Sequence, residues 1–141
     1  MIGGAGECVT LRIVAKHADH WNVWGGPNVL ARKSAILEEH CSKVGRDSRT
    51  IMRSVNMALL ITNKKDEIDA LADAITTRMG SHPADSRDTC LAGTPEQIRE
   101  QLGRLREAGA STLFLPTMFR PLDEIRRDLD RFIAEIAPAF R

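Results

Sequence analysis

Short apolar segments alternate with amphipathic helical segments along the whole sequence, and this alternation restricts the fold more than any other feature. Residues 20–24, 51–62 and 111–116 are rich in β-branched, aliphatic and aromatic side chains, a composition typical of strands. Residues 51–62 become almost continuously apolar toward their end, as in a strand covered on both faces. Strands that alternate with helices form βα units, so the sequence predicts an α/β protein with a parallel sheet and outer helices.

The segments between these strands show apolar residues at helical spacing. Leu11, Val14, Ala15 and Ala18 mark a helix from about residue 7 to residues 17–19, and similar stripes predict helices at 30–44, 66–79, 94–109 and 122–136. Thr94 and Gln97 form a capping-box pair around Pro95, a good first helical residue. Residues 81–88 are polar and contain proline, so we expect a loop there. Met1 and Ile2 look like the end of a further strand.

Size, composition and charge limit the classes of protein to consider. With 141 residues the chain is expected to form one domain, residues 1–141. The net charge of +1 argues against nucleic acid or an anionic membrane as a partner chosen by bulk charge. No apolar run is long enough to span a membrane, and no signal peptide is evident. Three dispersed cysteines cannot all pair within one chain, so we expect a soluble protein in a reducing cytoplasm.

A glycine-rich turn, Ile2-Gly3-Gly4-Ala5-Gly6, precedes the first helix. Glycines let backbone N–H groups approach a ligand closely, and a helix N-terminus adds partial positive charge. A strand, a glycine turn and a helix in this order suit a phosphate. A tight turn or a flexible terminus explains the same glycines equally well.

The strand at 20–24 contains Trp21, Asn22, Val23 and Trp24. The two-residue period of a strand places Asn22 and Trp24 on one face and Trp21 on the other. Ligands of parallel α/β proteins bind at the carboxyl ends of strands, so Asn22 or a neighbouring indole is a candidate contact for a flat cofactor ring. Filling of the space between sheet and helices is the alternative for both tryptophans.

Other chemistry has little support in the sequence. His17 and His20 are three residues apart without a third ligand at metal-site spacing, so no metal site is predicted. The cysteines form no CxxC motif, and no GxSxG motif is present. No catalytic acid, base or nucleophile is assigned.

Several motifs together resemble the C-terminal half of the luciferase-like flavin or deazaflavin oxidoreductases. In chain order they are residues 2–7, 10–12 and 18–22, His40-Cys41, residues 44–47, Gly93-Thr94-Pro95-Glu96-Gln97-Ile98 and Ala108-Gly109-Ala110. The match runs along nearly the whole chain and is closest to the coenzyme F420-dependent branch. It implies part of a (β/α)8 TIM barrel, with the active site at the carboxyl ends of the strands.

The resemblance also implies a cofactor and its contacts. Coenzyme F420, or alternatively FMN, would exchange hydride with a small-molecule substrate, in a reductase or monooxygenase reaction. Gly3, Gly4, Ala5 and Gly6 match the turn that lies against the cofactor or its phosphate, and Trp21 and Asn22 match the strand end near its pocket.

The chain is too short for the whole family fold, so Met1 falls where a mid-chain residue is expected and the N-terminal half is missing. Half a barrel leaves strand edges unpaired. We therefore expect a truncated chain that pairs with itself, as a homo-oligomer such as a dimer, or with a separate N-terminal half, unless it refolds into a different sheet. The alternative function is a catalytically silent half-barrel that self-associates and binds no cofactor.

Overall fold

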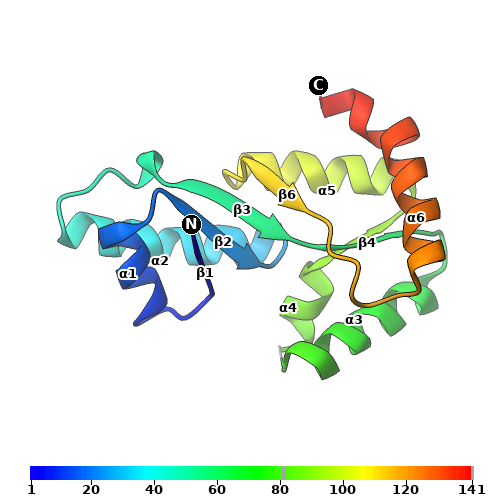
Figure 1. The fold of residues 1–141 in the computed structure, drawn as a ribbon, viewed down its shortest axis with the longest axis horizontal. Helices are drawn as coiled ribbons and strands as arrows, with labels where there is room; N and C mark the ends of the chain where they lie inside the picture. The colour runs from blue at the N-terminus through cyan, green and yellow to red at the C-terminus, as the bar shows by residue number, and fades with distance from the viewer. Residues whose placement is uncertain (81, 141) are drawn as a thin grey trace.

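The computed structural model describes residues 1–80 and 82–140, and its centre is a parallel sheet of four strands. In spatial order these are β1 (Ile2–Gly3), β2 (His20–Trp24), β3 (Met52–Asn56) and β6 (Thr112–Phe114). A second, two-stranded parallel sheet contains β4 (Ala58–Ile61) and β5 (Cys90–Gly93). Figure 1 shows β4 continuing the line of β3 away from the larger sheet.

Helices connect successive parallel strands and lie outside the sheets, as the sequence predicts. They are α1 (Thr10–His17), α2 (Pro27–Lys43), α3 (Lys65–Met79), α4 (Pro83–Asp88), α5 (Pro95–Glu107) and α6 (Leu122–Arg131). A 3₁₀ turn η1 (Ser48–Thr50) precedes β3, and α6 continues into a π-helical segment η2 (Phe132–Ile136) and a final 3₁₀ turn η3 (Ala137–Phe140). The first helix begins later than residue 7, because residues 7–9 belong to the turn that follows β1.

The expected single strand at 51–62 is two strands in different sheets. Met57 still donates its N–H to the Phe114 carbonyl at 3.1 Å, whereas Ala58 donates to the Thr89 carbonyl at 3.0 Å. The chain therefore runs straight on while its hydrogen-bonding partner changes from β6 to β5. Only the β4 part is buried throughout, because β3 has one face without a helix over it.

The prediction of a loop at 81–88 was wrong for the described part of that segment; Ser81 lies outside the described residues. The short helix α4 forms because His82 Nδ1 accepts a hydrogen bond from the Ala84 N–H at 3.2 Å, which caps its first turn. Strand β5 was not predicted, since four residues are too few to show a period.

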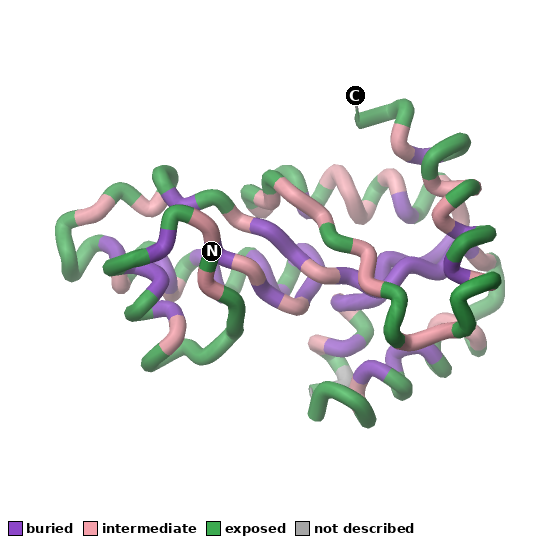
Figure 2. The backbone as a smooth tube through the Cα atoms, in the orientation of Figure 1, coloured by how far each residue is buried: buried purple, intermediate pink, exposed green. Residues whose placement is uncertain are grey.

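Buried residues lie along the strands and on the helices beside them (Figure 2), and most of them form one core cluster. Trp21, Val23 and Val55 point to the helix-covered face of the larger sheet. They belong to one cluster with Leu11, Val14, Leu30, Leu37, Ile98 and Leu105 from α1, α2 and α5. A second cluster joins β4 and β5 to α3. None of the described helices is long and apolar enough to cross a membrane.

A buried ion pair fixes α6 against β4. Arg120 Nη1 donates to Asp128 Oδ2 at 2.6 Å and to the Leu59 carbonyl at 2.9 Å. Asp128 also accepts the Ile61 N–H at 3.3 Å. The exposed fractions of the two side chains are only 13% and 5%, so neither charge has free access to water.

Asp128→Ala should therefore destabilise the protein strongly, because it removes the buried counter-charge of Arg120 and leaves the guanidinium with only the more exposed Glu124 carboxylate, at 3.3 Å. We expect a loss of about 3–5 kcal/mol in the free energy of unfolding, measured by urea denaturation. Asp130→Ala, on the exposed side of the same helix, should change it by about 0.5 kcal/mol or less. Equal effects of the two substitutions would contradict this role of the ion pair.

Candidate functional site

Parallel pairing aligns polar side chains in rows on the face of the sheet that no described helix covers. Asn22 is paired with Gly3 of β1 and with Ser54 of β3, and Trp24 is paired with Asn56. Since successive side chains alternate between faces, all of them lie on the same side. In a barrel this is the inner face.

Hydrogen bonds join these side chains into a fixed network. Asn22 Nδ2 donates to Ser54 Oγ at 2.9 Å, and Asn56 Nδ2 donates to Asn22 Oδ1 at 2.8 Å. His20 Nε2 lies 2.8 Å from Ser54 Oγ, at the amino end of the strands. The network fixes the Asn22 and Asn56 amides near the carboxyl ends of β2 and β3, where ligands of parallel α/β proteins bind.

The glycine turn lies next to this network at the end of β1. The Gly4 N–H donates to the Asn22 carbonyl at 3.0 Å. Gly4 has a φ of +134°, and a Cβ there would lie 3.0 Å from Thr10 Cγ2, so both the backbone conformation and the packing of the turn require glycine. At Gly3 the nearest atom to an added Cβ is 4.0 Å away, which means that the inner face beside Asn22 is open.

Trp21 supports the turn from the opposite face. Its side chain is completely buried, and its indole Nε1 donates to the Gly4 carbonyl at 2.9 Å. Of the residues that the resemblance assigns to the cofactor, Gly3, Gly4 and Asn22 are therefore adjacent, while Trp21 lies beneath the turn among core side chains.

A cavity of about 270 Å³ opens at the carboxyl ends of β1 and β2. It is lined by Gly4, Ala5, Trp24, Val29, Lys33, Ile75, Met79, Asp85 and Thr89. The Trp24 ring packs edge to face against Phe119, with 5.7 Å between the ring centroids. One wall of the cavity is therefore the Trp24 indole, which this contact keeps in place. The cavity and the polar rows share Trp24 and together form the candidate site.

Charge near the turn is balanced rather than strongly positive. Lys33 is buried, and its Nζ donates to Glu7 Oε1 at 2.6 Å. The Lys33 ammonium holds the pKa of the Glu7 carboxyl below its usual range. A single buried cation thus lies at the cavity wall, already paired with a carboxylate from the turn.

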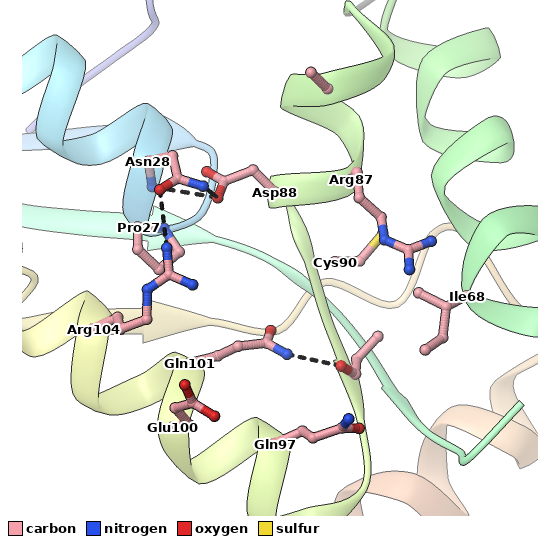
Figure 3. Close-up of a pocket in the computed structure, with 12 residues that line it drawn as sticks. Pro27, Asn28, Ile68, Arg87, Asp88, Cys90, Gln97, Glu100, Gln101 and Arg104 are labelled. Atoms are coloured by element: carbon pink, nitrogen blue, oxygen red, sulfur yellow. Dashed lines mark hydrogen bonds between the residues drawn. The ribbon is translucent and has the colours of Figure 1, made fainter. Parts of the chain in front are cut away.

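A second cavity, of about 440 Å³, lies between α2, α4, β5 and α5 (Figure 3). Its polar groups are paired with one another: Asp88 accepts the Val29 N–H at 2.9 Å and the Asn28 side-chain amide at 2.8 Å, and Arg104 donates to Asn28 Oδ1 at 2.9 Å. Asp88 therefore caps α2 from a distant segment. A Cβ at Gly26 would overlap the Asp88 carbonyl oxygen. These contacts hold α2 against α4 and α5, so the polar groups that make them have a structural role.

Burial limits the reactivity of two of the three thiols. Burial raises the pKa of Cys90 to about 12 and also raises that of Cys41, so neither is a nucleophile near neutral pH. Cys8 is exposed. Within residues 1–80 and 82–140, no group of three His, Cys, Asp or Glu side chains could hold a metal ion.

Sequence reasoning missed Ser54, Asn56 and Lys33. Ser54 and Asn56 alternate with Arg53 and Val55, a two-residue period that was hidden by the apolar run that follows. Lys33 gave no sequence signal, because its position depends on how α2 packs against the turn.

Comparison with solved structures shows that the chain has the fold of about half of several larger oxidoreductases. The chain matches coenzyme F420-dependent tetrahydromethanopterin reductase from Methanopyrus kandleri with a TM-score of 0.72 and 18% identity, over 99% of this chain and 50% of that chain. It matches an F420-dependent secondary alcohol dehydrogenase in complex with an F420–acetone adduct with a TM-score of 0.69 and 17% identity, over 99% of this chain and 48% of that chain. It also matches a type II Baeyer–Villiger monooxygenase of Pseudomonas putida, in complex with FMN, with a TM-score of 0.55 and 16% identity, over 96% of this chain and 46% of that chain.

These likenesses confirm the predicted fold class, a partial TIM barrel with parallel strands and outer helices, and the resemblance to the luciferase-like enzymes at the level of the fold. The chain spans about half the length of these structures. No protein-family model matches the chain, and no curated protein sequence matches it.

The Glu7–Lys33 pair predicts how the free energy of unfolding depends on pH. Because the pKa of Glu7 is lower in the folded protein than its ordinary value of 4.5, the pair stabilises the fold above about pH 4.5, and this contribution disappears as pH falls through the lowered pKa. Glu7→Gln should flatten the acid limb of a plot of unfolding free energy against pH. Glu39→Gln, on the exposed surface of α2, should leave it unchanged. Identical acid limbs for wild type and Glu7→Gln would contradict the pair.

Thiol labelling tests the burial of the cysteines. The native protein should react rapidly with one equivalent of a disulfide reagent, at Cys8, and with the remaining thiols only after unfolding, because Cys41 and Cys90 are 1% and 5% exposed. Cys8→Ser should abolish the rapid phase. Rapid reaction of a second thiol in that variant would show that the core is more open than the structure.

Proposed function

We propose that this chain is the cofactor-binding half of an F420-dependent oxidoreductase, with FMN as the alternative cofactor. The observation that supports the proposal most directly is the open inner face beside Gly3, which adjoins the Asn22 and Asn56 amides and the strand-end cavity with Trp24. The structural relatives include proteins named for F420 and a protein in complex with FMN.

The residues present fit a flat, polar heterocyclic ring. Gly3 leaves room for the ring, and carboxamides such as Asn22 and Asn56 can donate to ring carbonyls and accept from ring N–H groups. The Trp24 indole supplies an apolar, aromatic surface. Ser54 holds the Asn22 amide in place by accepting from its Nδ2.

The turn would take the phosphate end of the cofactor. Within the described residues, the N–H groups of Ala5, Gly6 and Glu7 donate to no backbone carbonyl. Lys33, at the cavity wall, is the cation nearest to this region of the lining. The carboxylate of its partner Glu7 would repel an anion. On binding, Lys33 would therefore have to break its ion pair with Glu7 and pair with the phosphate instead.

When bound, F420 or FMN would supply hydride transfer to or from an organic substrate. The residues of this chain would orient the ring through Asn22 and Asn56 and limit water access through Trp24 and Phe119. No residue is assigned as a proton donor or acceptor. The free thiols support action in a reducing compartment such as the cytoplasm.

A half-barrel cannot enclose a cofactor alone. We propose that the working protein contains a second half, either another copy of this chain or a separate N-terminal half. The substrate would bind between the two halves, over the inner face of the sheet.

Titration of the chain with F420 and, separately, with FMN tests the proposal through the intrinsic fluorescence of each cofactor. Binding in the micromolar range supports it, and the tighter ligand identifies the cofactor. No binding of either at about 1 mM, which corresponds to about 4 kcal/mol, would refute cofactor binding by this chain itself and favour the catalytically silent half-barrel.

Gly3→Val tests the position of the ring. Valine is a good strand residue, and the nearest atom to its Cβ would be 4.0 Å away, so the thermal midpoint should not fall. The side chain would occupy the proposed ring position and weaken cofactor binding by about tenfold or more, which corresponds to about 1.4 kcal/mol.

Gly3→Ala should give a smaller loss of affinity than Gly3→Val. Met52→Val, at the exposed amino end of β3 on the same face, should bind as wild type does. Unchanged affinity in Gly3→Val would place the ring elsewhere.

A further inference from the structure

The four-stranded sheet has two open edges, formed by β1 and β6. All its strands are parallel. Parallel sheets are normally enclosed, and an open strand edge pairs readily with another strand. The two edges are therefore the surfaces on which a partner is most needed.

An apolar groove lies on the outer face of the β6 edge. Its volume is about 660 Å³, and its main lining side chains are Leu102, Leu105, Leu113, Phe132 and Phe140. Phe140 is 42% exposed, and the neighbouring Ile133 of η2 is 57% exposed. A strand added beside β6 would direct its outward side chains into this groove.

The β1 edge presents complementary features. Ile2 pairs with Trp21 and therefore lies on the outer face, while Gly3 lies on the inner face. The exposed apolar residues Val9 and Ile13 flank this edge, at the start of α1 and within it, with exposed fractions of 58% and 43%. One edge thus offers a groove and the other offers protruding apolar side chains.

We propose that two copies of this chain close into one eight-stranded parallel barrel, with β6 of each copy paired with β1 of the other. A two-fold axis along the barrel axis keeps every strand parallel, and it satisfies both edges of both copies at once. Ile2 of one copy then fills the groove beside Leu113 of the other. Repulsion between copies is small, because the net charge of each is only +1.

This pairing explains the polar inner face and deepens the candidate site. The row Gly3, Asn22, Ser54, Thr112 continues from one copy into the next. Phe114 and the segment after it lie beside the partner's Gly3–Gly6 turn, so each of two sites contains residues from both copies. The pairing concerns the sheet edges and does not depend on whether a cofactor binds.

Sedimentation equilibrium of the full chain over about 1–100 µM tests the assembly. We expect a dimer that does not grow further, because the two-fold arrangement pairs both edges of the four-stranded sheet in each copy. In the same samples, hydrogen exchange should show residues 2–3 and 112–114 more strongly protected in the dimer than after dilution to monomer.

Ile13→Asp and Phe140→Asp should each weaken the dimer by about tenfold or more, because a carboxylate would be buried at an apolar contact. Both side chains are exposed in the single chain, so circular dichroism should show an intact fold. Val44→Asp is the matched control, with 41% exposure at the end of α2, away from both edges.

Three results would overturn the proposal. The first is a monomer over the whole concentration range, including one that associates only with a separately supplied N-terminal half. The second is an open series of larger assemblies. The third is a dimer that Val44→Asp weakens as much as the edge variants do, or that gives residues 2–3 and 112–114 no more protection than the monomer has.

Discussion

The parallel pairing of β2 with β3 is the constraint on which the rest of the structure depends. In this register Trp21, Val23 and Val55 all face the helices, while Asn22, Ser54 and Asn56 all face the opposite side. A shift of one residue would exchange the two sets and bury the amides among aliphatic side chains. Burial of one set therefore fixes the position of the other, and the polar rows are a direct consequence of the packed core.

Two further contacts hold the strand ends in place around this sheet. Trp21 reaches the Gly4 carbonyl from below, so the glycine turn is supported by the core of the sheet. Asp88 caps α2 from the far side, where Gly26 allows the two backbones to meet. The cavity lies between these supports, which suits a preorganised binding site.

Much of the architecture could be predicted from periodicity and capping. Thr94 and Gln97 form the expected capping box, and the helical stripes gave α2, α3 and α5 within a few residues. Local patterns could not show that the chain changes partners at Met57, because the change depends on β5, which lies far along the sequence. Residue motifs led to Gly3, Gly4 and Asn22, which are adjacent in the structure. Lys33 reaches the site only through tertiary packing, and the alternation that includes Asn56 was hidden by the apolar run that follows it.

The central claim is that the inner face at the strand ends is the ligand-binding surface of this half-barrel. The most direct measurement is a two-dimensional amide NMR spectrum of the labelled chain during titration with F420. The account predicts the largest shift changes at the amides of Gly4 to Gly6, at the Asn22 side chain and at the Trp24 indole N–H. Changes confined to Asn28, Gln101 and Arg104, around the cavity between α2 and α5, would contradict it.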